Sequence, residues 1–152
     1  MNRFKRSMLF IVCAVAGYIL LLPLQGHAHC QIPCGIYDDA ARIQSMLEDT
    51  ATIEMAYKSI TNLAGKTDAQ SQNQMVRWVV NKEKHAQKII STINDYFLTQ
   101  RVKPSQKDYA ERLAKHHAVI IAGMKTKQNA NVKYAKTLKE SIEALRSYYP
   151  EH

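Results

Sequence analysis

The chain has 152 residues, which suits one domain of ordinary size, and 46% of them are hydrophobic. Lys and Arg number 21 against 13 Asp and Glu, so the formal net charge is +8. The basic residues are dispersed along the sequence without interleaved aromatic residues, which is not the pattern of a nucleic-acid-binding surface. We therefore expect no nucleic-acid partner.

The first 28 residues differ from the rest. A basic start is followed by an almost unbroken apolar run over residues 8–22, and Gly26 and Ala28 occupy the −3 and −1 positions of a cleavage site. This order predicts a secretory signal peptide, residues 1–28, removed after Ala28. The alternative is an uncleaved membrane anchor, but a run of about 15 residues is short for a span that needs roughly 20. Cleavage leaves 18 basic and 13 acidic residues, a net charge of +5.

The predicted cleavage also sets the compartment. A mature chain without residues 1–28 is expected to be exported, to the periplasm or the extracellular space, with no stable membrane association. Cys13 leaves with the signal peptide, so Cys30 and Cys34 are the two cysteines that remain.

Apolar residues recur at three- and four-residue spacing through four segments, which is the period of amphipathic helices, and strand-like alternation is absent. The connections are short, which favours antiparallel neighbours. Residues 38–152 are therefore expected to form an all-α, up-down-up-down antiparallel four-helix bundle. Asp38 is a good N-cap for the first helix and Gly65 a good stop. The expected helices cover residues 38–63 and 68–98, a third segment that begins near Pro104, and a fourth from about Asn131 to Pro150.

Titratable residues in this bundle do not predict a buried cofactor site. A di-iron centre needs inward Glu and Glu-x-x-His pairs, and Glu83 stands only two residues before His85. His116 and His117 point about 100° apart on a helix, so we expect them to be packed or solvated. Trp78 is expected in the core or in an interface. The apolar faces are expected to be Met75, Trp78, Val79, Ala86, Ile89, Ile90, Ile93 and Phe97 in the second helix and Tyr109, Leu113, Ile120, Ile121 and Met124 in the third.

The new N-terminus would carry an unusual set of metal donors. His29 offers an α-amine and an imidazole, and Cys30 offers a backbone amide and a thiol. Cys34 adds a second thiol if the chain turns back, a turn that Pro33 and Gly35 favour. Amine, amide nitrogen and two thiols make a planar N2S2 set, a geometry that nickel(II) or copper(II) favours over zinc.

We call residues 29–37 the hook. Its sequence is also compatible with functions other than redox catalysis. An exported chain meets an oxidising compartment, so a Cys30–Cys34 disulfide in a small binding or stress protein is one alternative. A metal carrier that binds nickel or copper without turnover is another. Structural zinc usually needs four protein ligands, which the hook does not supply. A lipoprotein start at Cys30 does not suit the bulky His29 before it.

The hook closely resembles that of the nickel superoxide dismutases. Their signature, His-Cys-x-x-Pro-Cys-Gly-x-Tyr at the processed N-terminus, is complete here from His29 to Tyr37. The resemblance continues at Ala41-Arg42-Ile43 and at Asn94-Asp95-Tyr96-Phe97, and it covers nearly all of residues 29–152. It implies one nickel ion per subunit, superoxide as the substrate, and conversion of superoxide to O2 and H2O2 as nickel cycles between +2 and +3.

The resemblance also implies roles for single residues. Cys30 and Cys34 would bind nickel in the plane, and the His29 imidazole would bind axially in the oxidised state. Tyr37 and Tyr96 would lie over the open face, where they would exclude larger anions and orient water or peroxide. Family members form hexamers of four-helix bundles, so a homohexamer is expected.

Two positions depart from the family pattern. Aligned on Ala41-Arg42-Ile43, Gln44 stands where many members carry an acidic residue that hydrogen-bonds the axial imidazole. Aligned on residues 94–97, His85 stands where they carry the arginine behind that acid. Both changes weaken negative charge near His29, so we expect them to raise the nickel potential without abolishing activity.

Overall fold

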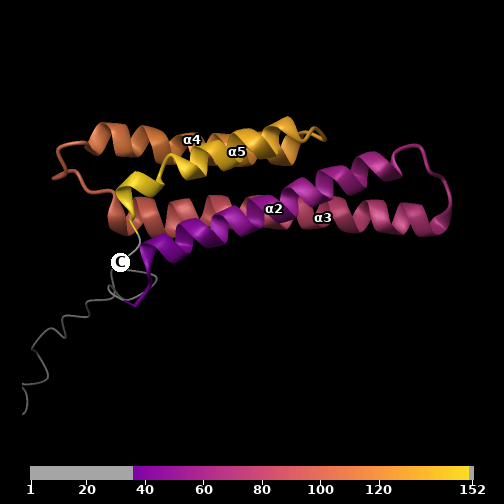
Figure 1. Cartoon of the computed structure of the whole chain (residues 1–152), viewed down its shortest axis with the longest axis horizontal. Coiled ribbons are helices and arrows are strands. Elements are labelled where there is room, and N and C mark those ends of the chain that lie inside the picture. The colour runs from indigo at the N-terminus through magenta and orange to yellow at the C-terminus, as the bar shows by residue number, and fades with distance from the viewer. Residues whose placement is uncertain (1–35, 151–152) are drawn as a thin grey trace, which may run out of the picture.

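The computed structural model describes residues 36–150, and no strand occurs among them. Their helices run antiparallel in the order up, down, up, down (Figure 1), which confirms the predicted all-α four-helix bundle. The elements are α2 (Asp39–Leu63), α3 (Ala69–Ser91) with its π-helical continuation η1 (Thr92–Arg101), α4 (Tyr109–Gln128), α5 (Lys133–Glu143) and a short 3-10 turn, η2 (Arg146–Tyr148).

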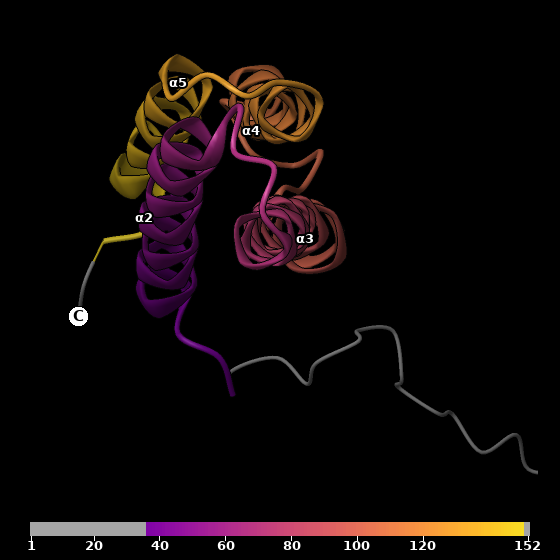
Figure 2. The ribbon, with the colours of Figure 1, turned by 90° about the vertical axis from the view of Figure 1, so that its right-hand side faces the viewer.

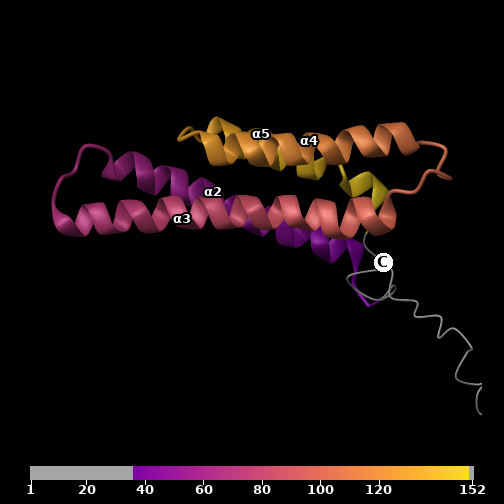
Figure 3. The ribbon, with the colours of Figure 1, turned by 180° about the vertical axis from the view of Figure 1, so that it is seen from behind.

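The four helices surround one core, as the view along the bundle shows (Figure 2). The α2–α3 hairpin is longer than the α4–α5 pair and extends beyond it at the α2–α3 connection (Figures 1 and 3). At the opposite end, the start of α2 and the end of the described chain lie close together (Figure 1). Within residues 36–150, none of the helices combines the length and the apolar character that a membrane crossing requires.

The ends of α2 form as the sequence predicts. The Asp38 side chain caps the helix by accepting a hydrogen bond from the Ala41 amide at 3.1 Å. After the helix, Gly65 adopts a φ of 80°, in the left-handed region where a side chain would be strained. The α2–α3 hairpin therefore begins and turns for local reasons.

The core consists of one continuous cluster contributed by every long helix. The predicted core residues of the second helix are buried from Ala86 onward, whereas Met75 and Trp78 are only half-buried and Val79 is exposed. These three residues precede the stretch that α4 and α5 cover. A core position is therefore wrong for Met75 and Val79, and the prediction of an interface position for Trp78 stays a prediction. The fully buried apolar residues are Ile43, Met46, Ile53, Ala56, Ala86, Ile89, Ile93, Phe97, Val119, Ala135, Leu138, Ile142 and Leu145.

The third helix starts later than predicted. Pro104 does not lie in its first turn, because Lys103 O accepts a hydrogen bond from the Gln106 amide at 3.0 Å and places Pro104 second in a tight turn. That position suits the fixed φ of proline. The helix begins five residues on, at Tyr109, with Asp108 as its N-cap residue.

The predicted core face of the third helix is wrong in part: Ile120 packs against the core and Tyr109 is half-buried. Leu113, Ile121 and Met124 are exposed, while His116 and Thr126 are fully buried. Both buried polar side chains have internal partners, so their burial leaves no hydrogen bond unmade. Apolar spacing alone could not identify this face, because it cannot anticipate where a polar group will be satisfied.

Candidate functional site

Most of the predicted nickel site precedes the described residues. His29, Cys30, Pro33, Cys34 and Gly35 all lie outside them. Residues 36–150 contain no group of three or more His, Cys, Asp or Glu side chains arranged to hold a metal ion. What the structure does place is the protein surface where the hook joins the bundle.

Tyr37 and Tyr96 meet at this junction. Their ring centroids are 6.1 Å apart, and the rings are tilted by 40°. The Tyr96 hydroxyl also donates to the Tyr37 carbonyl oxygen at 3.3 Å. Tyr96 is buried, whereas Tyr37 is 38% exposed. The two predicted aromatic residues therefore form one pair, with Tyr37 outermost.

Two charged residues that sequence reasoning missed fix the phenol of Tyr96. Its hydroxyl donates a short hydrogen bond to Asp39 Oδ1 and accepts one from Arg101 Nη2 at 2.8 Å. Arg101 Nε in turn donates to Asp39 Oδ1 at 2.7 Å. Burial and the neighbouring Asp39 carboxylate raise the pKa of Tyr96, so the phenol keeps its proton at neutral pH.

The Tyr96 hydroxyl is thus occupied by protein groups. Its single proton is shared between Asp39 and the Tyr37 carbonyl, which leaves none for a ligand. The Tyr37 hydroxyl, by contrast, has no hydrogen-bond partner among residues 36–150. Of the two phenols predicted to orient water or peroxide, only that of Tyr37 lacks a hydrogen-bond partner among the described residues.

Tyr37 separates two hollows on the protein surface. One, of about 510 Å³, lies between the start of α2 and the C-terminal segment, and Asp39, Arg101 and Tyr148 contribute to its wall. The other, of about 210 Å³, lies between Tyr37 and Tyr96 and is bordered by Arg42 and Lys88.

Arg42 brings positive charge directly to Tyr37. Its guanidinium carbon lies 4.7 Å from the centre of the Tyr37 ring, a cation–π arrangement. Its Nε is buried and has no hydrogen-bond partner among the described residues. The smaller hollow therefore combines an aromatic wall with the cationic Arg42 and Lys88, and the acidic Asp95 also contributes to its lining.

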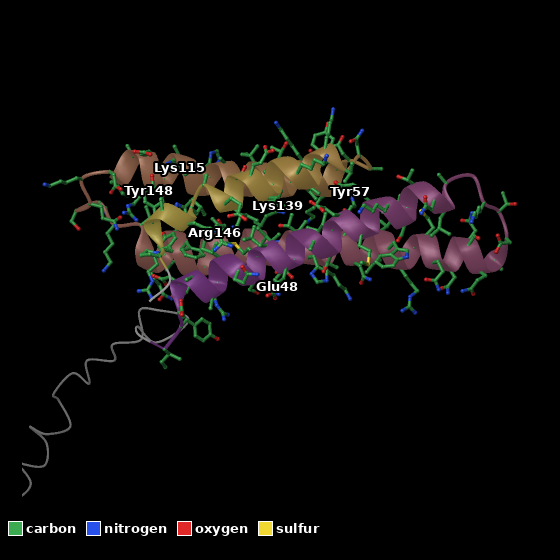
Figure 4. The ribbon with its side chains drawn as sticks, viewed as in Figure 1. Glu48, Tyr57, Lys115, Lys139, Arg146 and Tyr148 are labelled. Carbon is green, nitrogen blue, oxygen red and sulfur yellow. The ribbon has the colours of Figure 1, made fainter. Side chains whose placement is uncertain are left out.

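Gln44 and His85 do not form a pair. Gln44 is exposed on α2, and its Oε1 accepts a hydrogen bond at 3.2 Å from Nη2 of Arg146, which is labelled in Figure 4. His85 Nδ1 lies 2.7 Å from Oδ1 of Asp49, a buried residue of α2. Each therefore has its own partner, and their predicted influence on a metal stays a prediction.

Comparison with known proteins identifies the family. The family described as nickel-containing superoxide dismutase matches residues 24–152, a range that includes the hook and the whole bundle. Comparisons with curated proteins and with solved structures found no match. The complete hook motif, the four-helix bundle and the Tyr37–Tyr96 pair at their junction agree with this family, and the chain belongs to the nickel-containing superoxide dismutases.

Proposed function

We propose that this enzyme dismutes superoxide at the hook, residues 29–37, after a peptidase has exposed His29. The observation that carries the proposal is the complete motif from His29 to Tyr37, which lies inside the range matched by the family and directly after a predicted cleavage site. Because Cys34 stands only three residues before Tyr37, a metal bound there is expected close to the Tyr37–Tyr96 pair.

The donor chemistry fits nickel. The α-amine and imidazole of His29, the amide nitrogen of Cys30, and the thiolates of Cys30 and Cys34 would hold the ion. When bound, nickel supplies a centre that changes between the +2 and +3 states, made accessible by two electron-rich thiolates. The amine is available only after cleavage, because in the precursor it is locked in a peptide bond.

Tyr37 in the hook and the bundle residues next to it have separate roles in this proposal. Tyr37, which is more exposed than Tyr96, restricts access and offers its hydroxyl to water or peroxide. The Tyr96 hydroxyl holds Tyr37 in place by donating a hydrogen bond to the Tyr37 carbonyl oxygen. Arg42 places positive charge directly beside Tyr37, which favours the approach of the superoxide anion.

We propose that the mature enzyme is exported and acts in the periplasm or outside the cell. The support is the signal-peptide pattern of residues 1–28. N-terminal sequencing of protein recovered from the exported fraction checks this, and a mature chain that still begins with Met1 would contradict it.

We propose that six copies assemble, as the family resemblance implies. The support in this chain is exposed apolar surface on α3, where Val76, Val79 and Val80 are 61%, 38% and 42% exposed. These residues precede Lys82, which contacts the end of α4, so they belong to the first part of α3, next to the α2–α3 connection. The α2–α3 hairpin extends beyond α4 and α5 at this connection (Figure 3). Sedimentation equilibrium gives the mass directly, and a monomer across the micromolar range would reject the hexamer.

The function is tested on protein whose N-terminus is shown to be His29. We expect nearly one nickel per chain and rapid superoxide loss in stopped-flow assays, with both abolished in Cys30→Ser. Gln31→Ser is the matched control, since it changes the same segment without removing a donor. A chain that keeps Ala28 has both thiols but no free amine at His29, and we expect it to be inactive.

Two outcomes would support the alternatives. Stoichiometric nickel without superoxide loss would indicate a metal carrier. Absence of nickel, with Cys30 and Cys34 joined in a disulfide that returns after reduction and reloading, would indicate an exported helical protein without this chemistry.

A further inference from the structure

The second long helix ends in a π-helical segment, η1, and this segment brings Arg101 to the hydroxyl of Tyr96. Over η1 the backbone changes to π-helical hydrogen bonding, in which each amide bonds the carbonyl five residues before it. The Val102 amide accordingly donates to Phe97 O at 3.0 Å. In an α-helix, residues five apart are about 140° apart around the axis. The wider π turn instead lets Arg101 reach the hydroxyl of Tyr96.

Arg101 then bridges two parts of the chain. Its Nη2 bonds Tyr96 within η1, and its Nε bonds Asp39 at the first turn of α2. The Tyr96 hydroxyl completes the arrangement with bonds to Asp39 Oδ1 and to the Tyr37 carbonyl oxygen. We call Asp39, Tyr96 and Arg101 the clamp.

The position of Asp39 is not explained by helix capping. Asp38 already supplies the cap for α2 by accepting a hydrogen bond from the Ala41 amide. The Asp39 carboxylate is directed across the bundle to η1, and its side chain is 28% exposed while that of Arg101 is 24% exposed. Partial burial limits solvent screening of this ion pair. The clamp thus holds the residues at which the hook joins the bundle.

We propose that Asp39 and Arg101 are positioning residues for the nickel centre: they fix Tyr96, and through it Tyr37, so that the hook leaves the bundle in one orientation. The proposal rests on the function given above, because it assumes that the hook binds nickel. It assigns the clamp no contact with the metal. Its effect passes through the Tyr37 carbonyl and the start of α2.

The first test needs no metal. In Arg101→Gln we expect the amides of Arg42 and Ile43 in metal-free protein to exchange hydrogen about tenfold faster than in the wild type. Arg112→Gln is the matched control, because Arg112 Nε also bonds an aspartate, Asp108, at 2.8 Å. Unchanged exchange at the start of α2 in Arg101→Gln would overturn the proposal.

The second test uses the nickel-loaded enzyme. We expect nickel release to a chelator to be on the order of tenfold faster in Arg101→Gln and unchanged in Arg112→Gln. If Arg101 acts through Tyr96, the double variant Arg101→Gln/Tyr96→Phe releases nickel no faster than the faster single variant. Additive effects, or release equal to that of the wild type, would overturn the proposal.

A third variant separates positioning from loss of stability. Arg101→Lys keeps the charge but has no second donor in the guanidinium geometry. We expect its thermal midpoint to match the wild type and its nickel release to be intermediate. Wild-type protein that takes up no nickel would reject the proposed function and, with it, the role of the clamp at a nickel centre. The hydrogen-exchange test needs no metal, so it would still decide whether the clamp holds the start of α2.

Discussion

His85 on α3 lies 2.7 Å from the carboxylate of Asp49 on α2, and Asp49 is only 4% exposed. Lys88, one turn further along α3, contacts the same carboxylate at 2.9 Å. One buried carboxylate on α2 therefore binds the side chains of two basic residues on α3. The role of His85 in the bundle is to join these helices.

Replacing Asp49 tests this connection. We expect Asp49→Ala to lower the free energy of unfolding by about 2 kcal/mol, since hydrogen bonds to charged groups are lost while both basic partners can return to water. The adjacent exposed Glu48→Ala is expected to change it by less than about 0.5 kcal/mol (Figure 4). Urea unfolding at fixed protomer concentration measures both, and equal effects would contradict the assignment.

His116 is expected to make stability depend on pH. Its Nδ1 donates to Arg112 O at 2.7 Å, and its Nε2 accepts from the Tyr149 hydroxyl at 2.9 Å. Burial lowers the pKa of His116 below its usual 6.5. The unfolded chain thus binds the proton more readily. The contribution of neutral His116 is present above pH 6.5 and is lost as the pH falls below it.

The pH effect is measured by urea unfolding between pH 7.5 and 5. We expect the wild type to lose up to about 1.4 kcal/mol per pH unit below pH 6.5. His116→Gln should lack this slope, whereas His117→Gln, which changes the neighbouring exposed histidine, should retain it. A wild-type slope in His116→Gln would show that another group titrates.

Lys82, on α3, caps the C-terminal end of α4 by hydrogen bonds to its last carbonyl groups. Its ammonium donates to the carbonyl oxygens of Thr126, Lys127 and Asn129 at 3.1, 2.6 and 3.0 Å. Beside it, the Tyr57 hydroxyl donates to Thr126 O, and burial raises the pKa of Tyr57 to about 12. Tyr57 therefore remains a donor at any physiological pH.

We expect Lys82→Met to destabilise the protein by about 2 kcal/mol, because the partly buried carbonyl groups of Lys127 and Asn129 lose a charged donor while the packed stem is retained. The exposed Lys84→Met is the control and should change stability by less than about 0.5 kcal/mol. Thermal unfolding followed by circular dichroism checks both variants. A midpoint for Lys82→Met within a degree of the wild type would rule out this role.

Arg42 is expected to speed the arrival of superoxide. We expect Arg42→Gln to lower kcat/KM about two- to fivefold at low ionic strength and to flatten its dependence on salt. Arg77→Gln, an exposed change on α3 away from Tyr37, removes the same charge and should have little effect. Stopped-flow assays at several salt concentrations, with nickel content measured for each variant, make the comparison. Equal losses in both variants would indicate only an effect of net charge.

Local signals in the sequence predicted the four-helix bundle, and they predicted the hook, whose metal-binding residues lie outside the described part of the chain. The hook motif is read directly, because a metal set made of a terminal amine, an amide and two thiols comes from neighbouring residues. Asp38 and Gly65 marked the ends of α2 because capping depends on the adjacent backbone. The expectation that Tyr37 and Tyr96 both lie at the metal site came from the family resemblance, because residue spacing alone does not bring positions 37 and 96 together.

The tertiary structure decided which polar groups are buried and which charges meet. His116 and Lys82 enter the interior because partners on other segments satisfy their hydrogen bonds, and no periodicity within one helix reveals those partners. Arg101 reaches Tyr96 only because η1 is π-helical, a change of register that helical spacing cannot predict. The sequence thus predicted the groups proposed to bind the metal, and packing between distant segments determined how the bundle surface around Tyr37 is held.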